Sequence, residues 1–186
     1  MRQYALLVVL FALILLLYTL FPKPVTFFNE QEARDAVFKD VASLDAETRI
    51  LSSTQNGSTW EFEVLVTTNA HTACPSIERR FYKLPPVSFR PEPFITGCYE
   101  RSKLLYREEA LITSAKKLGI SEGYGCAFKA GASLTEEKKY CLNMNETAVS
   151  DFAVEIPPEA WIAYWDYHGQ QRLIALDENA AVLKTA

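Results

Sequence analysis

Apolar positions are spread unevenly along the chain, and the longest run of them lies near the N-terminus. From Tyr4 to Phe21 the sequence carries 18 residues without a charge. As a helix, this run would be about 27 Å long, close to the roughly 30 Å hydrocarbon core of a bilayer. We therefore predict that residues 1–21 form a membrane anchor helix that meets lipid through residues 4–21, followed by a short linker at 22–28.

Two other interpretations of this segment stay open. Arg2 ahead of an apolar stretch is also how cleaved secretory signals begin, although no small-residue cleavage site follows the run. A buried helix of a soluble protein is the second alternative. Arg2 and the terminal amine on one side of the run, against Lys23 on the other, favour a cytoplasmic N-terminus under the positive-inside rule.

The polar remainder begins with a pattern that indicates a helix and then a hairpin. Asn29 and, three positions later, Glu32 form a capping-box pair ahead of apolar residues that share one helical face. Trp60 opens a stretch in which large apolar residues alternate with polar ones, as in a half-buried strand. Asn56-Gly57 before it is typical of a tight turn. The predicted elements are a helix at 30–42 and strands at 49–52 and 59–68.

The second half of the chain repeats this order of helix and hairpin. Gly119 ends a helical pattern, and His168-Gly169-Gln170 separates two strongly apolar runs. The predicted elements are a helix at 106–118 and strands at 123–129, 138–144, 151–156, 161–167, 172–176 and 181–184. We therefore expect the α+β class: one domain of antiparallel sheet with two helices over residues 29–186, with 29–100 and 101–186 as subunits and an internal repeat of two helix–hairpin units.

Residues 75–97 differ from their surroundings because five prolines interrupt any long helix or central strand. Basic and aromatic side chains are interleaved among them, and both kinds are favoured where proteins bind one another. The candidate partner-binding residues of this predicted loop are Arg79, Arg80, Phe81, Tyr82 and Arg90. The alternative is a long connection whose aromatic side chains only pack over the sheet.

The four cysteines decide the compartment. Cys74, Cys98, Cys126 and Cys141 are an even set, which beyond a membrane predicts two disulfides. Three pairings are possible, and we favour Cys74 with Cys98 and Cys126 with Cys141, because sequential pairing closes two local loops. The alternatives are a zinc site using His71 or His168 and a thiol-redox site, but no vicinal C-x-x-C pair is present.

Charge and short motifs add limited information. Without residues 1–21 the chain keeps all 23 acidic residues and, once Arg2 is removed, 18 of its 19 basic ones, so its formal charge is 18 minus 23, or −5. This mild acidity argues against nucleic acid as a partner. Two N-x-S/T triplets make Asn56 and Asn145 candidate glycosylation sites in an extracytoplasmic domain.

A resemblance to a known family enters in the C-terminal part. Ala160 to Gly169, then Leu173 to Asp177, then Val182-Leu183 form an aromatic strand, a glycine turn, a strand that ends in Asp and a short final strand. This order resembles the closing strands of a PepSY-type domain, with the helix at 106–118 in the position of that family's helix. The chain has Asn179-Ala180-Ala181 where the family usually has a glycine. The resemblance implies a small extracytoplasmic module that carries no catalytic residues and either regulates or inhibits peptidases or takes part in sensing in the envelope.

Catalytic constellations are not recognisable in the sequence. A hydrolytic triad needs a base beside a nucleophile, and His71 and His168 are the two imidazoles available. Glu61 and Glu63 are expected on the solvent face of a strand, and Gly123-Tyr124-Gly125 lacks the Lys and the helix of a phosphate loop. We therefore expect no enzyme, no cofactor and no metal.

The resulting expectation is a single-pass membrane protein with a cytoplasmic N-terminus and an extracytoplasmic domain. That domain would be a non-catalytic binding or regulatory module for another protein of the cell envelope, with a peptidase as one class of partner. A structural subunit of a membrane or surface complex and a hydrolase with an unrecognised site remain the alternatives.

Overall fold

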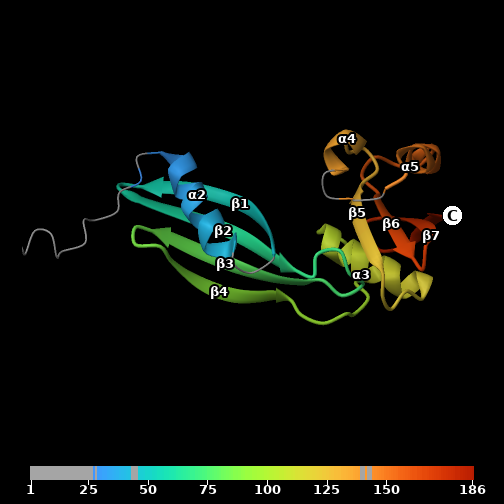
Figure 1. The fold of residues 1–186 in the computed structure, drawn as a ribbon, viewed down its shortest axis with the longest axis horizontal. Coiled ribbons are helices and arrows are strands. Elements are labelled where there is room, and N and C mark those ends of the chain that lie inside the picture. The colour runs from blue at the N-terminus through green and yellow to red at the C-terminus, as the bar shows by residue number, and fades with distance from the viewer. Residues whose placement is uncertain (1–26, 28, 43–45, 139–140, 142–143) are drawn as a thin grey trace, which may run out of the picture.

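The computed structural model describes residues 27, 29–42, 46–138, 141 and 144–186 (Figure 1). The predicted anchor at 1–21 and all of the linker except Phe27 lie outside these described residues. Within the described ranges, none of the helices combines the length and the apolar character needed to cross a bilayer.

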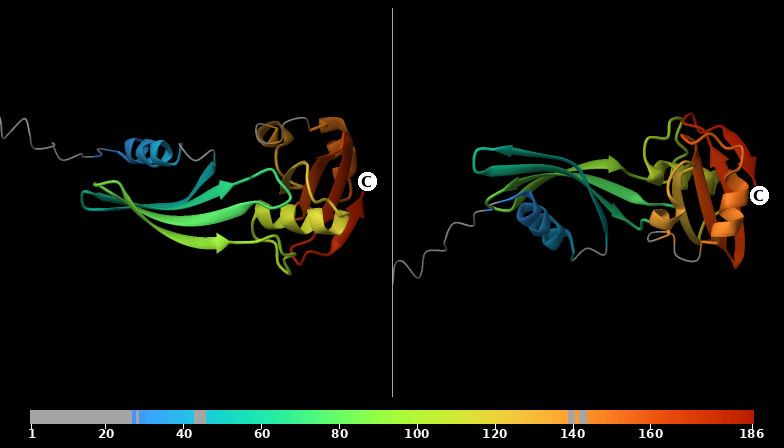
Figure 2. Two further views of the ribbon diagram at one scale, coloured as in Figure 1. Left: turned by 60° about the horizontal axis from the view of Figure 1, so that its bottom comes forward. Right: turned by 90° about the horizontal axis from the view of Figure 1, so that it is seen from above.

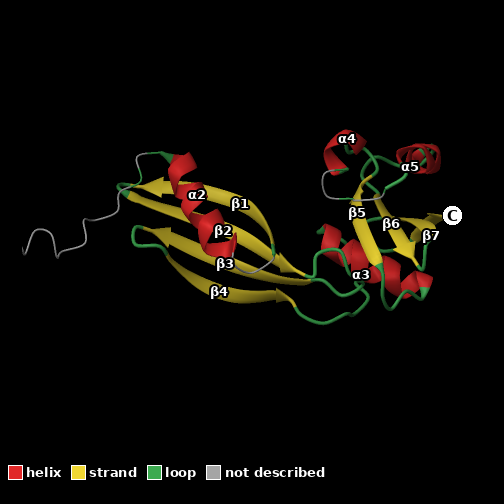
Figure 3. Cartoon of the chain, in the orientation of Figure 1, coloured by secondary structure: helices red, strands yellow, loops and turns green. Residues whose placement is uncertain are grey.

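Two antiparallel sheets and four helices make up the described part of the chain, which belongs to the α+β class (Figure 3). Each sheet has four strands in simple meander order, β1-β2-β3-β4 and β5-β6-β7-β8. The elements of the first half are α2 Glu30–Val41, β1 Glu47–Asn56, β2 Thr59–Thr68, β3 Ser76–Leu84 and β4 Ser88–Ile95. Those of the second half are α3 Arg107–Leu118, β5 Tyr124–Lys129, α4 Leu134–Glu137, α5 Glu146–Ala153, β6 Trp161–Tyr167, β7 Gln170–Leu176 and β8 Val182–Thr185.

The helix α2 covers one face of the first sheet. It begins where the sequence predicts, because the Asn29 side chain accepts a hydrogen bond of 2.9 Å from the Glu32 amide. Its buried stripe of Ala33, Val37 and Val41 packs on the large apolar side chains of the central strands. These side chains are Trp60, Phe62, Val64, Val66, Tyr82 and Leu84.

The predicted loop at 75–97 is wrong, because this segment forms the hairpin of β3 and β4. Its prolines are tolerated because β4 is an edge strand that pairs with β3 alone, so a missing N–H at Pro91 or Pro93 need not break a central ladder. Pro85 and Pro86 lie in the turn between the two strands. The hairpin therefore extends the sheet that the sequence predicts for β1 and β2.

The second sheet is covered on both faces. The helix α3 packs on one face with Leu111 and Ala115, and α5 packs on the other with Val149 and Phe152 (Figure 1). The predicted strand at 151–156 is wrong, because its first half belongs to α5 and its second half is turn and bend. Asn145 caps the first turn of α5 by accepting a bond from the Ala148 amide.

The predicted strand at 138–144 also finds no support where the chain is described. Lys138 lies in the turn after α4, Cys141 lies in a bend, and Met144 has no regular structure. Residues 139–140 and 142–143 lie outside the described residues. The helix at 106–118 agrees with α3, and Gly119 ends it with φ of +66°.

The helix α3 also joins the two sheets. Besides its contacts with the second sheet, it places Ile112 against Leu65, Ile77 and Ile95 of the first sheet. Figure 2 shows α3 at the place where the two sheets meet along the long axis of the molecule. One helix therefore contributes to both cores.

Both predicted disulfides are confirmed. Cys74 is bonded to Cys98 and Cys126 to Cys141, so all four cysteines are paired. The first bond links the segments that flank the β3–β4 hairpin. The second links β5 to the segment between α4 and α5.

Candidate functional site

The predicted partner-binding residues lie on two opposite faces of the first sheet. Strand residues alternate between faces, and the register pairs Tyr82 with Phe62, which points to α2. Tyr82 and Arg80 therefore lie on the α2 face. Arg79, Phe81 and, through its pairing with Phe81, Arg90 lie on the face opposite α2, here called the open face.

The open face carries charged side chains around a shallow groove. Arg79 forms an ion pair of 3.1 Å with Glu63, and Lys83 forms one of 3.5 Å with Glu61. A groove of about 580 Å³ lies over this region. Its open-face lining consists of Ser52, Thr54, Glu61, Glu63, Phe81, Lys83, Ser88 and Arg90. Cross-strand ion pairs of this kind also stabilise a solvated sheet face, so the two pairs alone do not define a binding site.

Phe81 and Arg90 distinguish this groove from an ordinary solvated face. The Arg90 guanidinium lies 5.1 Å from the centre of the Phe81 ring, and Arg90 is exposed. Among the described residues, Arg90 takes part in none of the ion pairs that hold Arg79 and Lys83. An exposed cation over a half-buried aromatic ring can receive an acidic group beside an apolar one.

The other two candidate residues serve the α2 face. The Tyr82 hydroxyl donates a hydrogen bond of 2.7 Å to Asp40, near the end of α2. Burial, with that bond to Asp40, raises the pKa of Tyr82 to about 12. Arg80 forms an ion pair with Glu78 and stacks over Phe89 at 4.4 Å. Both residues therefore hold the helix and the edge strand on the sheet.

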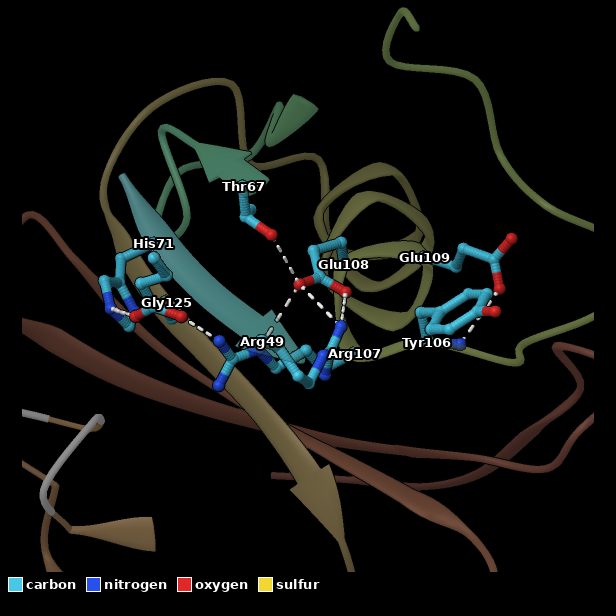
Figure 4. Close-up of polar contacts among 9 residues, drawn as sticks. Arg49, Thr67, His71, Tyr106, Arg107, Glu108, Glu109 and Gly125 are labelled. Carbon is cyan, nitrogen blue, oxygen red and sulfur yellow. Dashed lines mark hydrogen bonds and ion pairs between the residues drawn. The ribbon is translucent and has the colours of Figure 1, made fainter. Parts of the chain in front are cut away.

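A second polar cluster lies where the sheets meet, around the buried carboxylate of Glu108 in α3 (Figure 4). Its two oxygens each lie 3.2 Å from Nη2 of Arg49 in β1, and Oε1 also accepts a bond of 3.0 Å from Thr67 in β2. Arg107 approaches the same oxygen at 3.4 Å. Glu108 thus ties the start of α3 to two strands of the first sheet.

Glu47 extends this cluster to the second sheet. It forms an ion pair with Arg107 and also contacts His71, whose Nε2 lies 2.7 Å from the carboxylate. The other ring nitrogen of His71 lies 3.2 Å from the Gly125 carbonyl in β5, and the Gly125 amide donates to the His71 carbonyl. His71 therefore joins both sheets, as Figure 4 shows.

A cleft of about 480 Å³ lies beside this cluster, between the two sheets. Lys129 and Trp161 line it, with the Lys129 ammonium 4.0 Å from the ring. Burial lowers the pKa of Lys129, and burial raises the pKa of Glu137 on the other side of the cleft, against the opposing effect of Arg107. Clefts between lobes with perturbed groups are common ligand sites. Here Lys129 donates a hydrogen bond to the Glu159 backbone carbonyl, and Arg49 and Arg107 are held by Glu108 and Glu47.

The histidines and glutamates considered for catalysis lie in different parts of the fold. His168 is exposed in the β6–β7 turn, 3.8 Å from Glu122, whereas Glu61 and Glu63 lie on the open face in the ion pairs described above. In the described ranges, neither histidine is hydrogen-bonded to a hydroxyl or a thiol. No group of three metal-ligating side chains occurs within those ranges either. The cysteines of the zinc alternative are bonded to each other.

The two candidate glycosylation sites occupy different positions. Asn56 ends β1 at the exposed turn before Gly57, which has φ of +63°. The Asn145 side chain caps α5. Glycosylation at either position stays a prediction.

The sequence did not predict the polar cluster around Glu108 and Glu47 at the junction of the two sheets. Arg49 and Glu108 are 59 positions apart, and Glu47 and Arg107 are 60 apart, so no local spacing connects them. One signal was present, because Glu108 and Glu109 lie together in the first turn of α3. Acidic residues are expected there, and only burial separates the role of Glu108 from that of Glu109.

Comparisons of the chain with protein-family models, with curated proteins and with solved structures found no match.

Proposed function

We propose that the chain is a membrane-anchored, extracytoplasmic protein whose folded part binds another protein of the cell envelope without catalysing a reaction. The pairing of all four cysteines supports an oxidising compartment, because disulfides form and persist there. The apolar run from Tyr4 to Phe21 supplies the proposed anchor. Under the positive-inside rule the N-terminus would be cytoplasmic.

The observation that carries the binding role is the groove on the open face. It combines a half-buried aromatic ring, Phe81, with an exposed cation, Arg90, and opposite α2 no helix of the described chain covers it. The matching partner surface presents a carboxylate beside an apolar side chain, because the carboxylate would meet Arg90 while the apolar group lies on Phe81. Since peptidase regulation is what the PepSY resemblance implies, a peptidase is the partner class that we propose first.

The experiment is a crosslinking pull-down of the full chain from native membranes. The test variant carries Phe81→Ala with Arg90→Ala, and the matched control carries Phe38→Ala with Lys39→Ala. The control likewise removes a phenylalanine and a base, but from α2 on the other side of the sheet, where both are exposed. We expect the test variant to lose at least about tenfold in partner recovery, which corresponds to about 1.4 kcal/mol, while the control keeps it.

Two measurements separate binding from folding. The melting temperature of the control should stay within about 2 °C of the parent, because it removes exposed groups. The test variant should melt a few degrees lower, because Phe81 is half-buried, but still in a single transition. Full recovery of the partner with the test variant would contradict the proposal. Equal loss in both variants would also contradict it, because that result would place the contact outside the groove.

A further inference from the structure

The end of the molecule that carries the N-terminal part of the chain is fixed by α2. Phe27 packs against the core of the first sheet, and the Glu30 carboxylate accepts a hydrogen bond of 2.6 Å from Ser53 in β1. Ser53 is three residues before Asn56, where β1 ends, so Glu30 lies about 10 Å from that turn at the strand rise of about 3.3 Å per residue.

Two hairpin turns lie side by side at this end. The register pairs Trp60 with both Gln55 and Leu84, so the β1–β2 turn and the β3–β4 turn are level. Figures 1 and 2 show both turns at the end of the long axis opposite the C-terminus. We call residues Pro85–Phe89 the tip. They comprise the β3–β4 turn and the first two residues of β4.

The tip exposes large apolar side chains at the end of the molecule that carries the N-terminal part of the chain. Val87 is 43% exposed and Phe89 41% exposed, and Pro86 between Pro85 and Val87 is exposed as well. From Lys83 to Arg90 the sequence has a base at each end and no acidic residue. A surface of this chemistry fits the interface of a bilayer, where apolar side chains enter and basic ones stay among the headgroups.

We propose that the tip contacts the headgroup layer of the bilayer that holds residues 4–21. This inference rests on the proposed function, because it needs the anchor. Phe21 and Phe27 are six residues apart, which spans at most about 20 Å. The headgroup layer adds roughly 5 to 7 Å on each side of the hydrocarbon core. With residues 4–21 in the bilayer, Phe27 and the end of the molecule that carries the tip therefore lie within about 20 Å of the hydrocarbon core. In the proposed arrangement the C-terminal sheet lies farther from the lipid.

The test places an environment-sensitive fluorescent amino acid at position 87 or at position 182 of the full chain in phosphatidylcholine vesicles. Val182 is the matched control because it is also a valine, is 47% exposed, and belongs to β8 in the second sheet. The vesicles contain lipids with a quencher attached near the headgroup. The probe at 87 should lose most of its fluorescence, and the probe at 182 should keep most of it.

The outcomes distinguish the two proposals. A chain that is washed from the vesicles by alkaline carbonate would contradict the anchor, and with it the proposed function and this inference. A chain that stays in the vesicles with unquenched probes at both positions would overturn the lipid contact alone. A probe at 87 that is shielded from water but not quenched would show that a second copy covers the tip, which would also overturn it.

Discussion

At the scale of single residues, the side chain that couples most distant parts of the fold is Glu108. It is fully buried and meets Arg49, Thr67 and Arg107. A buried carboxylate is costly to desolvate, and good geometry with several donors offsets that cost. Removing its charge leaves Arg49 without its carboxylate partner at the junction of the sheets, whereas Arg107 keeps its ion pair with Glu47.

Glu108→Gln should therefore lower the free energy of unfolding by about 3 kcal/mol, as measured by urea denaturation. Glu109→Gln is the matched control, since it changes the neighbouring residue in the same way. Glu109 accepts from the Leu105 and Tyr106 amides, and glutamine fills this capping role as well, so a loss below about 1 kcal/mol is expected. Similar losses in both variants would contradict the role given to Glu108.

The raised pKa of Tyr82 predicts that the free energy of unfolding depends on pH in the alkaline range. Its pKa is about 12 in the folded chain against 10.0 for an ordinary tyrosine, so the folded state holds this proton more tightly than the unfolded state. The free energy of unfolding should therefore fall as the pH rises from about 10 toward about 12. Tyr82→Phe should flatten this dependence and cost about 1 kcal/mol near neutral pH through the lost bond to Asp40. An unchanged alkaline slope in the variant would contradict the assignment.

At the scale of elements, the sequence predicts those whose signals are local. Asn29 and Gly119 mark the limits of α2 and α3 because caps depend on neighbouring residues alone. The proline-rich hairpin could not be predicted, because its prolines are acceptable only at a sheet edge, and strand order is a tertiary property. For α5 the signal was present: Asn145, considered as a glycosylation site, is the helix cap.

Each of the two disulfides should stabilise the fold measurably. Cys126→Ala with Cys141→Ala should lower the free energy of unfolding by about 3 kcal/mol, because the bond closes a loop of 15 residues in the unfolded chain. Cys74→Ala with Cys98→Ala should cost slightly more, since its loop has 24 residues. Urea titration without reductant measures both. Unchanged midpoints would show that the bonds do not constrain the unfolded chain.

At the scale of the whole molecule, α3 packs against both sheets, and the groups at the junction cross between them. The two sheets should therefore unfold together. The three tryptophans allow a direct check, because Trp60 is in the first sheet and Trp161 and Trp165 are in the second.

We expect Trp60→Phe, which leaves fluorescence only in the second sheet, to give one unfolding transition that coincides with the transition seen by circular dichroism. Trp161→Phe with Trp165→Phe, which reports on the first sheet, should do the same at its own midpoint. Fluorescence and circular dichroism transitions that separate in either variant would show that the sheets unfold independently.

The proposed placement of the molecule, anchored in a membrane with its folded part in an oxidising space, is tested most directly by thiol labelling of the full chain in isolated membranes. Carbonate extraction is applied to the same sample. The chain is predicted to stay with the membranes, and its four cysteines to react with maleimide only after reduction and unfolding. A chain that is released by carbonate and reacts at all four cysteines when unfolded without reductant would contradict the account.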